Sequence, residues 1–382
     1  MEQTFDHMAI VGIGTALPPY RLDQADTARR LVEALGDKQD AARWARRIFK
    51  QCGVESRYTC EPNLQEEAAA CRYFPRSLED NVPTTAERMS IYKRESVPLA
   101  LSAARAALSD AGTAAGDITH LITVSCTGQF LPGLDAVLVR ELGLPANVTR
   151  LPLTFIGCAA GLKAVCLSRQ LAAGYPGANV LVVCVELCTL HIQPTGDRDS
   201  LFGVSFFGDG ASACVVAKAD SRHKHVFLLG EQRSVLLPEG AEEMVWEVGN
   251  YGFDLYLSPN IPKLIGEWIP QEIERLCGTE KPELWAVHPG GKGIIEVLRD
   301  RYALSDEQVA PSLGVLRDIG NVSSATILFV LQAMRKQLRE QGSTGVEGLA
   351  LAFGPGLTAE LIKIAYASSV IRSEQLTDEL YA

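Results

Sequence analysis

Continuous apolar segments alternate with helix-like segments along the chain, and this alternation predicts an α/β fold. The clearest strand pattern is the run Asn179-Val180-Leu181-Val182-Val183-Cys184-Val185. Uninterrupted apolar strands of this kind are typical of a central sheet that helices cover on both faces. Strands are predicted at 8–13, 119–125, 151–156, 179–186, 211–218, 225–236, 284–288, 347–353 and 358–366. Helices are predicted at 22–36, 39–51, 95–112, 158–174, 260–276, 291–302 and 322–340.

The alternation runs through the chain twice, and the short polar segment 219–224 separates the two runs. A chain of 382 residues exceeds the size at which one hydrophobic core usually stops growing, so two fused halves are expected. We therefore predict one domain at 1–222 and a second at 223–382. The segment 60–95 is polar and rich in proline, and it is expected to be an irregular surface excursion.

The composition restricts the partners that the protein can have. The formal net charge is −10, which argues against nonspecific nucleic-acid binding, because that binding depends on a basic surface. A local basic patch could still bind an anionic small molecule. No stretch reaches the ~18 uninterrupted apolar residues of a membrane-spanning helix, and the N-terminus lacks the features of a secretory signal. We therefore expect a cytoplasmic protein with neither a nucleic acid nor a membrane as partner.

The cysteines and histidines do not form the spacings of a disulfide framework or a metal site. Ten cysteines include no Cys-x-x-Cys pair, so they are expected to be reduced and mostly buried in the core. The six histidines are scattered, and no metal site is expected.

Cys158 lies where an apolar strand gives way to an amphipathic helix, in Gly157-Cys158-Ala159-Ala160-Gly161. Small neighbours leave its sulfur open to a substrate. The start of the following helix directs unpaired N–H groups and a positive dipole end toward the sulfur, which favours the thiolate. A packing cysteine is the alternative, because free cysteine is among the most buried residue types.

Two more residues lie at comparable positions in the second half. His288 ends a strand and begins His288-Pro289-Gly290-Gly291, and Asn321 precedes a long helix in Gly320-Asn321-Val322-Ser323-Ser324-Ala325. Each also has a purely structural interpretation, as a buried histidine or as a helix N-cap. The chemical interpretation is that His288 donates a hydrogen bond or takes a proton beside the sulfur, while Asn321 donates to a thioester oxygen.

Together with Phe207-Gly208-Asp209-Gly210 and Phe353-Gly354-Pro355-Gly356-Leu357-Thr358, these motifs resemble the type III polyketide synthases, the chalcone-synthase-like branch of the thiolase fold. The resemblance implies two similar βαβαβ-type halves in a five-layered αβαβα core. It also implies that Cys158 carries the acyl chain, and that His288 and Asn321 stabilise the enolate left by malonyl-CoA decarboxylation. In this interpretation His288 keeps the thiolate ionised.

The resemblance also assigns the walls of the cavity. Phe207 matches a gating phenylalanine, although a plain core aromatic is the alternative. Leu255 replaces a second gating phenylalanine, which suggests a wider gate, and it could equally be a core leucine. The other residues that match cavity positions are Cys126, Thr127, His191 and Ser323. We expect His191 to shorten the cavity and to offer the polyketide a polar contact, or else to face away and cap a loop.

Residues outside the cavity are implied to bind the partner subunit and the substrate. Leu131 matches a loop residue that reaches into the other subunit's site, so a homodimer is implied. Arg47 matches a coenzyme A (CoA)-binding position. Lys50, Lys292 and Gly293 are expected to contribute to the same site, but a cluster of charges can also be just a solvated face.

The leading functional prediction is iterative decarboxylative Claisen condensation of malonyl-CoA onto an acyl-CoA starter, followed by cyclisation to a pyrone, resorcinol or phloroglucinol-type product. No cofactor is expected, because the CoA thioesters are substrates. One alternative is a single condensation like that of ketoacyl-carrier-protein synthase III. The other is a catalytically silent acyl-CoA-binding relative.

Overall fold

The computed structural model describes residues 8–74, 81–193, 196–279 and 281–369. Within them, nine strands form one mixed sheet in the order β11-β12-β13-β8-β1-β7-β6-β4-β5. These strands are β1 (Met8–Ala16), β4 (His120–Ser125), β5 (Thr149–Thr154), β6 (Asn179–Leu187), β7 (Asp209–Lys218), β8 (Val226–Leu236), β11 (Leu284–Val287), β12 (Val346–Gly354) and β13 (Thr358–Ala367).

The sheet consists of two parts with the same pairing pattern. In the first half, β7 pairs antiparallel with both β1 and β6, and β6 pairs parallel with β4. In the second half, β13 pairs antiparallel with both β8 and β12, and β12 pairs parallel with β11. The two parts meet where β1 pairs with β8 at only two residue pairs, Ala9–Leu228 and Ile10–Phe227. The repeated pattern confirms the predicted pair of similar α/β halves.

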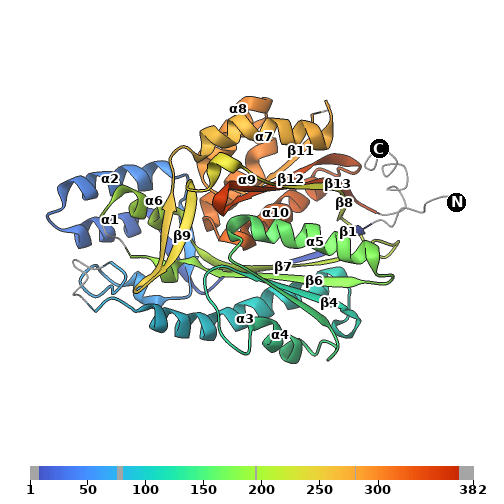
Figure 1. Ribbon diagram of the computed structural model, residues 1–382, viewed down its shortest axis with the longest axis horizontal. Helices are drawn as coiled ribbons and strands as arrows, with labels where there is room; N and C mark the ends of the chain where they lie inside the picture. The colour runs from blue at the N-terminus through green and yellow to red at the C-terminus, as the bar shows by residue number, and fades with distance from the viewer. Residues whose placement is uncertain (1–7, 75–80, 194–195, 280, 370–382) are drawn as a thin grey trace.

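Helices separate and cover the two parts of the sheet in five layers (Figure 1). Helices α5 (Ala160–Gly174) and α10 (Thr326–Glu340) form the middle layer, and their apolar residues share one core with both parts of the sheet. Helices α3 (Thr85–Ala111) and α4 (Leu134–Leu142) cover one outer face. Helices α7 (Ile261–Cys277) and α8 (Lys292–Tyr302) cover the other. The αβαβα order predicted from the family resemblance is confirmed.

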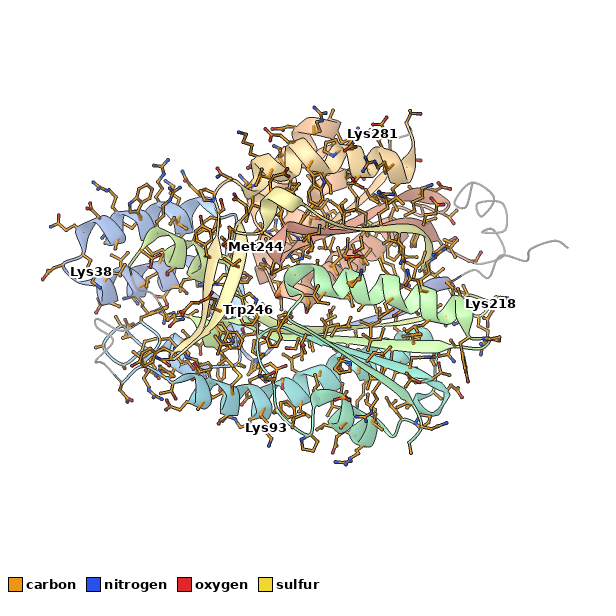
Figure 2. The ribbon with its side chains drawn as sticks, in the orientation of Figure 1. Lys38, Lys93, Lys218, Met244, Trp246 and Lys281 are labelled. Carbon is orange, nitrogen blue, oxygen red and sulfur yellow. The ribbon has the colours of Figure 1, made fainter. Side chains whose placement is uncertain are left out.

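A group of smaller elements lies beside the layered core (Figure 1). It contains α1 (Gln24–Leu35), α2 (Gln39–Gln51), α6 (Arg198–Phe206), the short pair β2 (Tyr20–Asp23) and β3 (Ser56–Thr59), and the hairpin of β9 (Met244–Gly249) and β10 (Gly252–Leu257). Figure 2 shows Met244 and Trp246 along β9, between this group and the core. The hairpin thereby supplies a wall of the site described below.

Several elements differ from the sequence prediction. Helix α3 begins at Thr85, so the segment 60–95 is not irregular throughout; Thr84 and Glu87 form a capping box just after Pro83, and Pro98 is accommodated inside the helix. Helices α4, α6 and α9 (Asp306–Ile319) and the strand β9 were not predicted. The first two helices have only nine residues each, and α9 contains a proline, so their periodicity is weak. No helix in the described ranges is long and apolar enough to cross a membrane.

Candidate active site

A tight backbone turn exposes Cys158 at the end of β5. Phe155 and Gly157 both have left-handed backbone conformations, with φ of 59° and 71°. A Cβ on Gly157 would lie 2.2 Å from Cδ of Pro355, so no side chain fits there. The chain then enters a short 3-10 turn and α5. Cys158 is partly accessible, whereas the two alanines that follow it are fully buried. The turn therefore opens the sulfur to the interior space beside it.

That space is a cavity of about 180 Å³ between the core, α6 and the β9–β10 hairpin. The residues predicted from the sequence that line it are Cys126, Thr127, Cys158, His191, Phe207, Leu255, His288, Asn321 and Ser323. Further lining residues that the sequence did not reveal are Met244, Trp246, Phe253, Gln193 and Phe353. Side chains from both halves of the chain thus meet around one sulfur.

Asn321 has an amide whose orientation its neighbours determine. Its Oδ1 accepts hydrogen bonds from the Ser323 backbone N–H at 2.8 Å and from the Thr326 hydroxyl at 3.3 Å. Because both neighbours donate, the other amide atom must be the NH2 group. This Nδ2 lies 3.9 Å from Cys158 Sγ and 3.4 Å from the Gly290 carbonyl oxygen. Asn321 therefore organises the turn before α10 and also directs a donor at the sulfur.

His288 lines the same cavity at the end of β11. Its backbone N–H donates to the Leu351 carbonyl at 2.8 Å, which holds the end of β11 against β12. The imidazole is fully buried, and neither of its nitrogens has a hydrogen-bond partner among the described residues. Burial lowers the pKa of His288 to about 3. The neutral ring keeps one N–H donor and one acceptor available to a substrate.

The sulfur of Cys158 is neutral at rest. Its Sγ lies 3.7 Å from Ser323 Oγ, and the hydroxyl, the Asn321 amide and its own backbone N–H all favour the thiolate. Burial outweighs them and raises the pKa of Cys158 to about 11. This differs from the thiolate that the helix start led us to expect, because the cavity removes water from the sulfur.

The two residues predicted to form a gate, Phe207 and Leu255, come from different elements. Phe207 follows α6, and its ring packs against Phe206 with centroids 4.6 Å apart. Leu255 is on β10 opposite Trp246, and its Cδ2 approaches the Gly203 position of α6. Both side chains are partly exposed and both line the cavity.

His191 lines the cavity and also links three segments. Its Nε2 donates to the Thr127 carbonyl at 2.7 Å, and its Nδ1 accepts from the Phe253 backbone N–H at 3.1 Å. The ring stacks on Phe253 at 4.0 Å, and Phe253 stacks on Trp246 at 4.5 Å. Because both ring nitrogens are already hydrogen-bonded, His191 does not have the free polar group that we expected it to offer the polyketide.

The two domains of one known protein family together match nearly all of the chain. Residues 3–220 match "Chalcone and stilbene synthases, N-terminal domain", and residues 229–367 match the corresponding C-terminal domain. The chain belongs to the chalcone and stilbene synthase family.

The similar curated proteins and solved structures come from bacteria, plants, algae and a slime mould. "Alpha-pyrone synthesis polyketide synthase-like Pks18" of Mycobacterium tuberculosis is 30% identical over 359 residues, which cover 92% of this chain and 89% of that protein. "Type III polyketide synthase A" of Arabidopsis thaliana is 33% identical over 334 residues, covering 84% and 83%. The C-terminal type III polyketide synthase domain of Steely1 from Dictyostelium superposes with a TM-score of 0.86 at 27% identity, covering 94% and 99%. PKS-I from the brown alga Ectocarpus siliculosus gives the same TM-score at 26% identity, covering 96% and 100%.

Membership establishes the broad chemistry. The protein is a type III polyketide synthase, an acyltransferase that depends on malonyl-CoA, and the family uses acyl-CoA and malonyl-CoA as substrates.

Beneath the cavity of this synthase lies a buried carboxyl that sequence reasoning missed. Glu186 accepts hydrogen bonds from the Cys126 backbone N–H at 3.0 Å, from the Thr127 hydroxyl at 2.7 Å and from the Ser324 hydroxyl. Burial raises its pKa to about 7. The sequence signal that could have revealed it is a single acidic residue near the end of the apolar run 179–187. Glu186 connects the loop after β4 to the turn that carries Asn321.

The residues predicted to bind CoA are not among those that line the cavity. Arg47 and Lys50 are exposed on α2. Lys292, at the start of α8, lies against Gly53 just beyond α2 and pairs with Glu296 at 2.9 Å. Gly293 follows it and packs near Pro262. Within the described ranges, no group of three acidic, histidine or cysteine side chains is arranged to hold a metal ion.

Proposed function

We propose that this synthase performs iterative decarboxylative Claisen condensations with Cys158, His288 and Asn321 as its catalytic residues. The observation that carries the proposal is that these three side chains, from both halves of the chain, line one cavity. Asn321 Nδ2 lies 3.9 Å from the sulfur, and both His288 nitrogens are free for a substrate.

In the loading step, Cys158 attacks the thioester carbon of the acyl-CoA starter. Because the pKa of Cys158 is raised and that of His288 is lowered, the resting pair is a thiol and a neutral imidazole. His288 therefore takes the Sγ proton as the carbon–sulfur bond forms, and it returns that proton to the CoA sulfur as CoA leaves. The starter is then held as a thioester on Cys158.

In the extension step, malonyl-CoA loses CO2, and negative charge develops on its thioester oxygen. Asn321 Nδ2 and the N–H of neutral His288 donate to this oxygen in a cavity with mostly apolar walls. The enolate carbon then attacks the Cys158 thioester, and the sulfur is released for the next round. The lengthened chain is returned to Cys158 for each further extension until it cyclises.

The remaining predicted residues have roles around this centre. Phe207 and Leu255 form the gate to the cavity, and His191 limits its depth. Cys126, Thr127 and Ser323 form its walls. The basic residues Arg47, Lys50 and Lys292, with Gly293, bind CoA at the mouth. No cofactor takes part in these steps.

We also propose that the protein is a homodimer. Leu131 is 90% exposed and does not line the cavity of its own chain. β5 is an edge strand of the sheet, and Phe155 beside it is 45% exposed. A second copy would cover these apolar groups.

The test is incubation with malonyl-CoA and a panel of acetyl-, medium-chain, long-chain and aromatic acyl-CoA starters, followed by mass spectrometry. Products with two or more added acetate units, absent with Cys158→Ala, would support the proposal. Cys166→Ala is the matched control, because Cys166 lies in α5, the helix that follows Cys158, but is buried in the core. A single extension, or activity only with malonyl-carrier protein, would instead support the ketoacyl-synthase alternative, which the family comparisons do not favour.

A further inference from the structure

A buried arginine lies directly behind the gate and the catalytic asparagine. Arg57, on β3, has no solvent-accessible surface. Its Nη1 donates to the Phe207 carbonyl oxygen at 2.8 Å. Its Nε and Nη2 have no hydrogen-bond partner among the described residues. Burying a guanidinium in this way is costly, so the single hydrogen bond to the gate residue calls for an explanation.

The Phe207 carbonyl lies in a segment whose backbone is hydrogen-bonded to the backbone of Asn321. We call this contact between the two segments the Phe207–Asn321 crossing. The Asn321 N–H donates to the Phe206 carbonyl at 2.8 Å, and the Gly208 N–H donates to the Asn321 carbonyl at 2.9 Å. These two hydrogen bonds form an isolated parallel bridge between Phe207 and Asn321. The gate and the catalytic amide are thus fixed to each other through their backbones.

Arg57 packs against both sides of this crossing. A Cβ on Gly208 would lie 3.2 Å from Arg57 Cβ, and a Cβ on Gly320 would lie 3.3 Å from it. The neighbouring residue Ser56 donates its hydroxyl to the Asp318 carbonyl at 2.8 Å. β3 therefore contacts the chain immediately before Asn321 as well as the chain around Phe207.

The charge of Arg57 is only partly compensated by its surroundings. Burial lowers the pKa of Arg57 to about 10, although Cys52 and the buried carboxyl of Asp209, two residues after Phe207, act in the opposite direction. Asp209 is itself held by the backbone N–H groups of Cys60 and Thr189, at 2.9 and 2.8 Å.

We propose that Arg57 is a positioning residue for the condensation reaction, which fixes the Phe207–Asn321 crossing and thereby the direction of the Asn321 amide toward Cys158. The proposal rests on the proposed function, because it assigns Asn321 to decarboxylation. Cys158 and His288 lie on other segments, the 3-10 turn before α5 and the chain just after β11. Loss of Arg57 should therefore impair the step that needs Asn321 more than the loading of Cys158.

The experiment compares two half-reactions of purified Arg57→Ala. Decarboxylation is followed as acetyl-CoA formed from malonyl-CoA alone, and loading is followed as the intact-mass increase of the protein with a starter that the wild type accepts. We expect decarboxylation to fall about 10- to 100-fold, as for a misplaced catalytic group, and loading to change less than about threefold. Arg57→Lys should recover part of the decarboxylation, because its ammonium can donate to the same carbonyl.

The matched control is Arg30→Ala. Arg30 is 2% exposed and likewise donates to backbone carbonyls, those of Leu64 and Glu66, but it does not line the cavity. Its loss should leave the ratio of the two half-reactions unchanged, because the Arg30 charge only opposes that of Arg57 and the hydrogen bond from Arg57 to Phe207 remains. In an Asn321→Ala background, Arg57→Ala should lower decarboxylation by less than a further ~threefold, because both changes act on one interaction.

Three results would each overturn the proposal. They are equal losses of decarboxylation and loading in Arg57→Ala, a changed ratio of decarboxylation to loading in Arg30→Ala, and effects of Arg57→Ala and Asn321→Ala on decarboxylation that multiply. If Arg57→Ala does not fold, Arg57→Lys and Arg57→Gln are judged by the same ratio. A wild-type protein that does not decarboxylate malonyl-CoA would refute the proposed function itself, and the role of Arg57 with it.

Discussion

His191 allows a direct test of how burial sets protonation in the cavity. Its Nε2 donates to the Thr127 carbonyl, and its Nδ1 accepts from the Phe253 N–H. An imidazolium has no lone pair at Nδ1, so protonation would break the second hydrogen bond and place a charge in an apolar wall. Burial accordingly lowers the pKa of His191 from 6.5 to about 4.

The lowered pKa makes folding stability depend on pH. The unfolded chain protonates His191 near pH 6.5 and the folded chain only near pH 4, so the unfolded state binds more protons between these values. The contribution of His191 to the free energy of unfolding is fully present above its pKa in the unfolded chain. It is lost as the pH falls toward its pKa in the folded chain. The full difference between these pKa values corresponds to about 3 kcal/mol. About 2 kcal/mol of this is lost between about pH 7.5 and pH 5.

The assay compares wild type with His191→Thr by guanidinium unfolding at one protein concentration. The excess free energy of unfolding of wild type over the variant should be about 2 kcal/mol smaller near pH 5 than near pH 7.5. Glu186 and Asp209, whose pKa values burial raises, act in the opposite direction but are present in both proteins. An excess that stays constant to within about 0.5 kcal/mol over this range would refute the reasoning. The same result is expected in a His120→Gln background, because His120 lies at the opposite end of β4 from Thr127.

Three further outcomes follow from the cavity and its supports. His191→Thr should give longer or altered products, because it removes a ring from the cavity wall; an unchanged product profile would contradict its role in limiting depth. Gly161→Ala should destabilise the protein by about 1–3 kcal/mol and reduce turnover, because the new Cβ would lie 2.0 Å from the Ser324 carbonyl oxygen. The control is Gly174→Ala, which lies in the same helix but faces open space and should change neither stability nor turnover. Since the pKa of Cys158 is about 11, its alkylation by iodoacetamide should increase about tenfold per pH unit between about pH 7 and pH 9. A plateau below pH 8 would show a thiolate at rest, and no labelling of Cys158 at any pH would favour a silent acyl-CoA-binding protein.

The meeting of Cys158, His288 and Asn321 in one cavity could be predicted from the sequence because each residue lies in its own short motif. Cys158 follows the last residues of a strand, His288 follows another, and Asn321 precedes a helix. In an α/β fold such positions meet at one edge of the sheet. Local pattern and fold class therefore indicated that the three residues could meet, and the family resemblance favoured the chemical interpretation over the structural alternatives.

The contacts that surround these three residues could not be predicted in this way. Arg57 and Phe207 are 150 residues apart, and their contact is a side chain to a backbone carbonyl, which leaves no pattern in the sequence. The stacked rings of His191, Phe253 and Trp246 come from a turn and a hairpin that only tertiary packing brings together. The neutral state of Cys158 was also beyond the sequence, since the start of a helix favours the thiolate and only the depth of burial outweighs it.

The buried groups of the cavity share one electrostatic tendency that bears on the proposed extension step. Burial raises the pKa of Cys158 and lowers the pKa values of His288 and His191, which favours the neutral form of all three side chains near pH 7. It also raises the pKa of Glu186 to about 7. The malonyl carboxylate therefore enters a space where its charge loses water and meets no fixed cation among the lining residues. Departure of CO2 moves that charge to the thioester oxygen, where Asn321 and His288 can donate to it. The same burial that keeps the sulfur protonated at rest thus favours loss of CO2 over retention of the carboxylate.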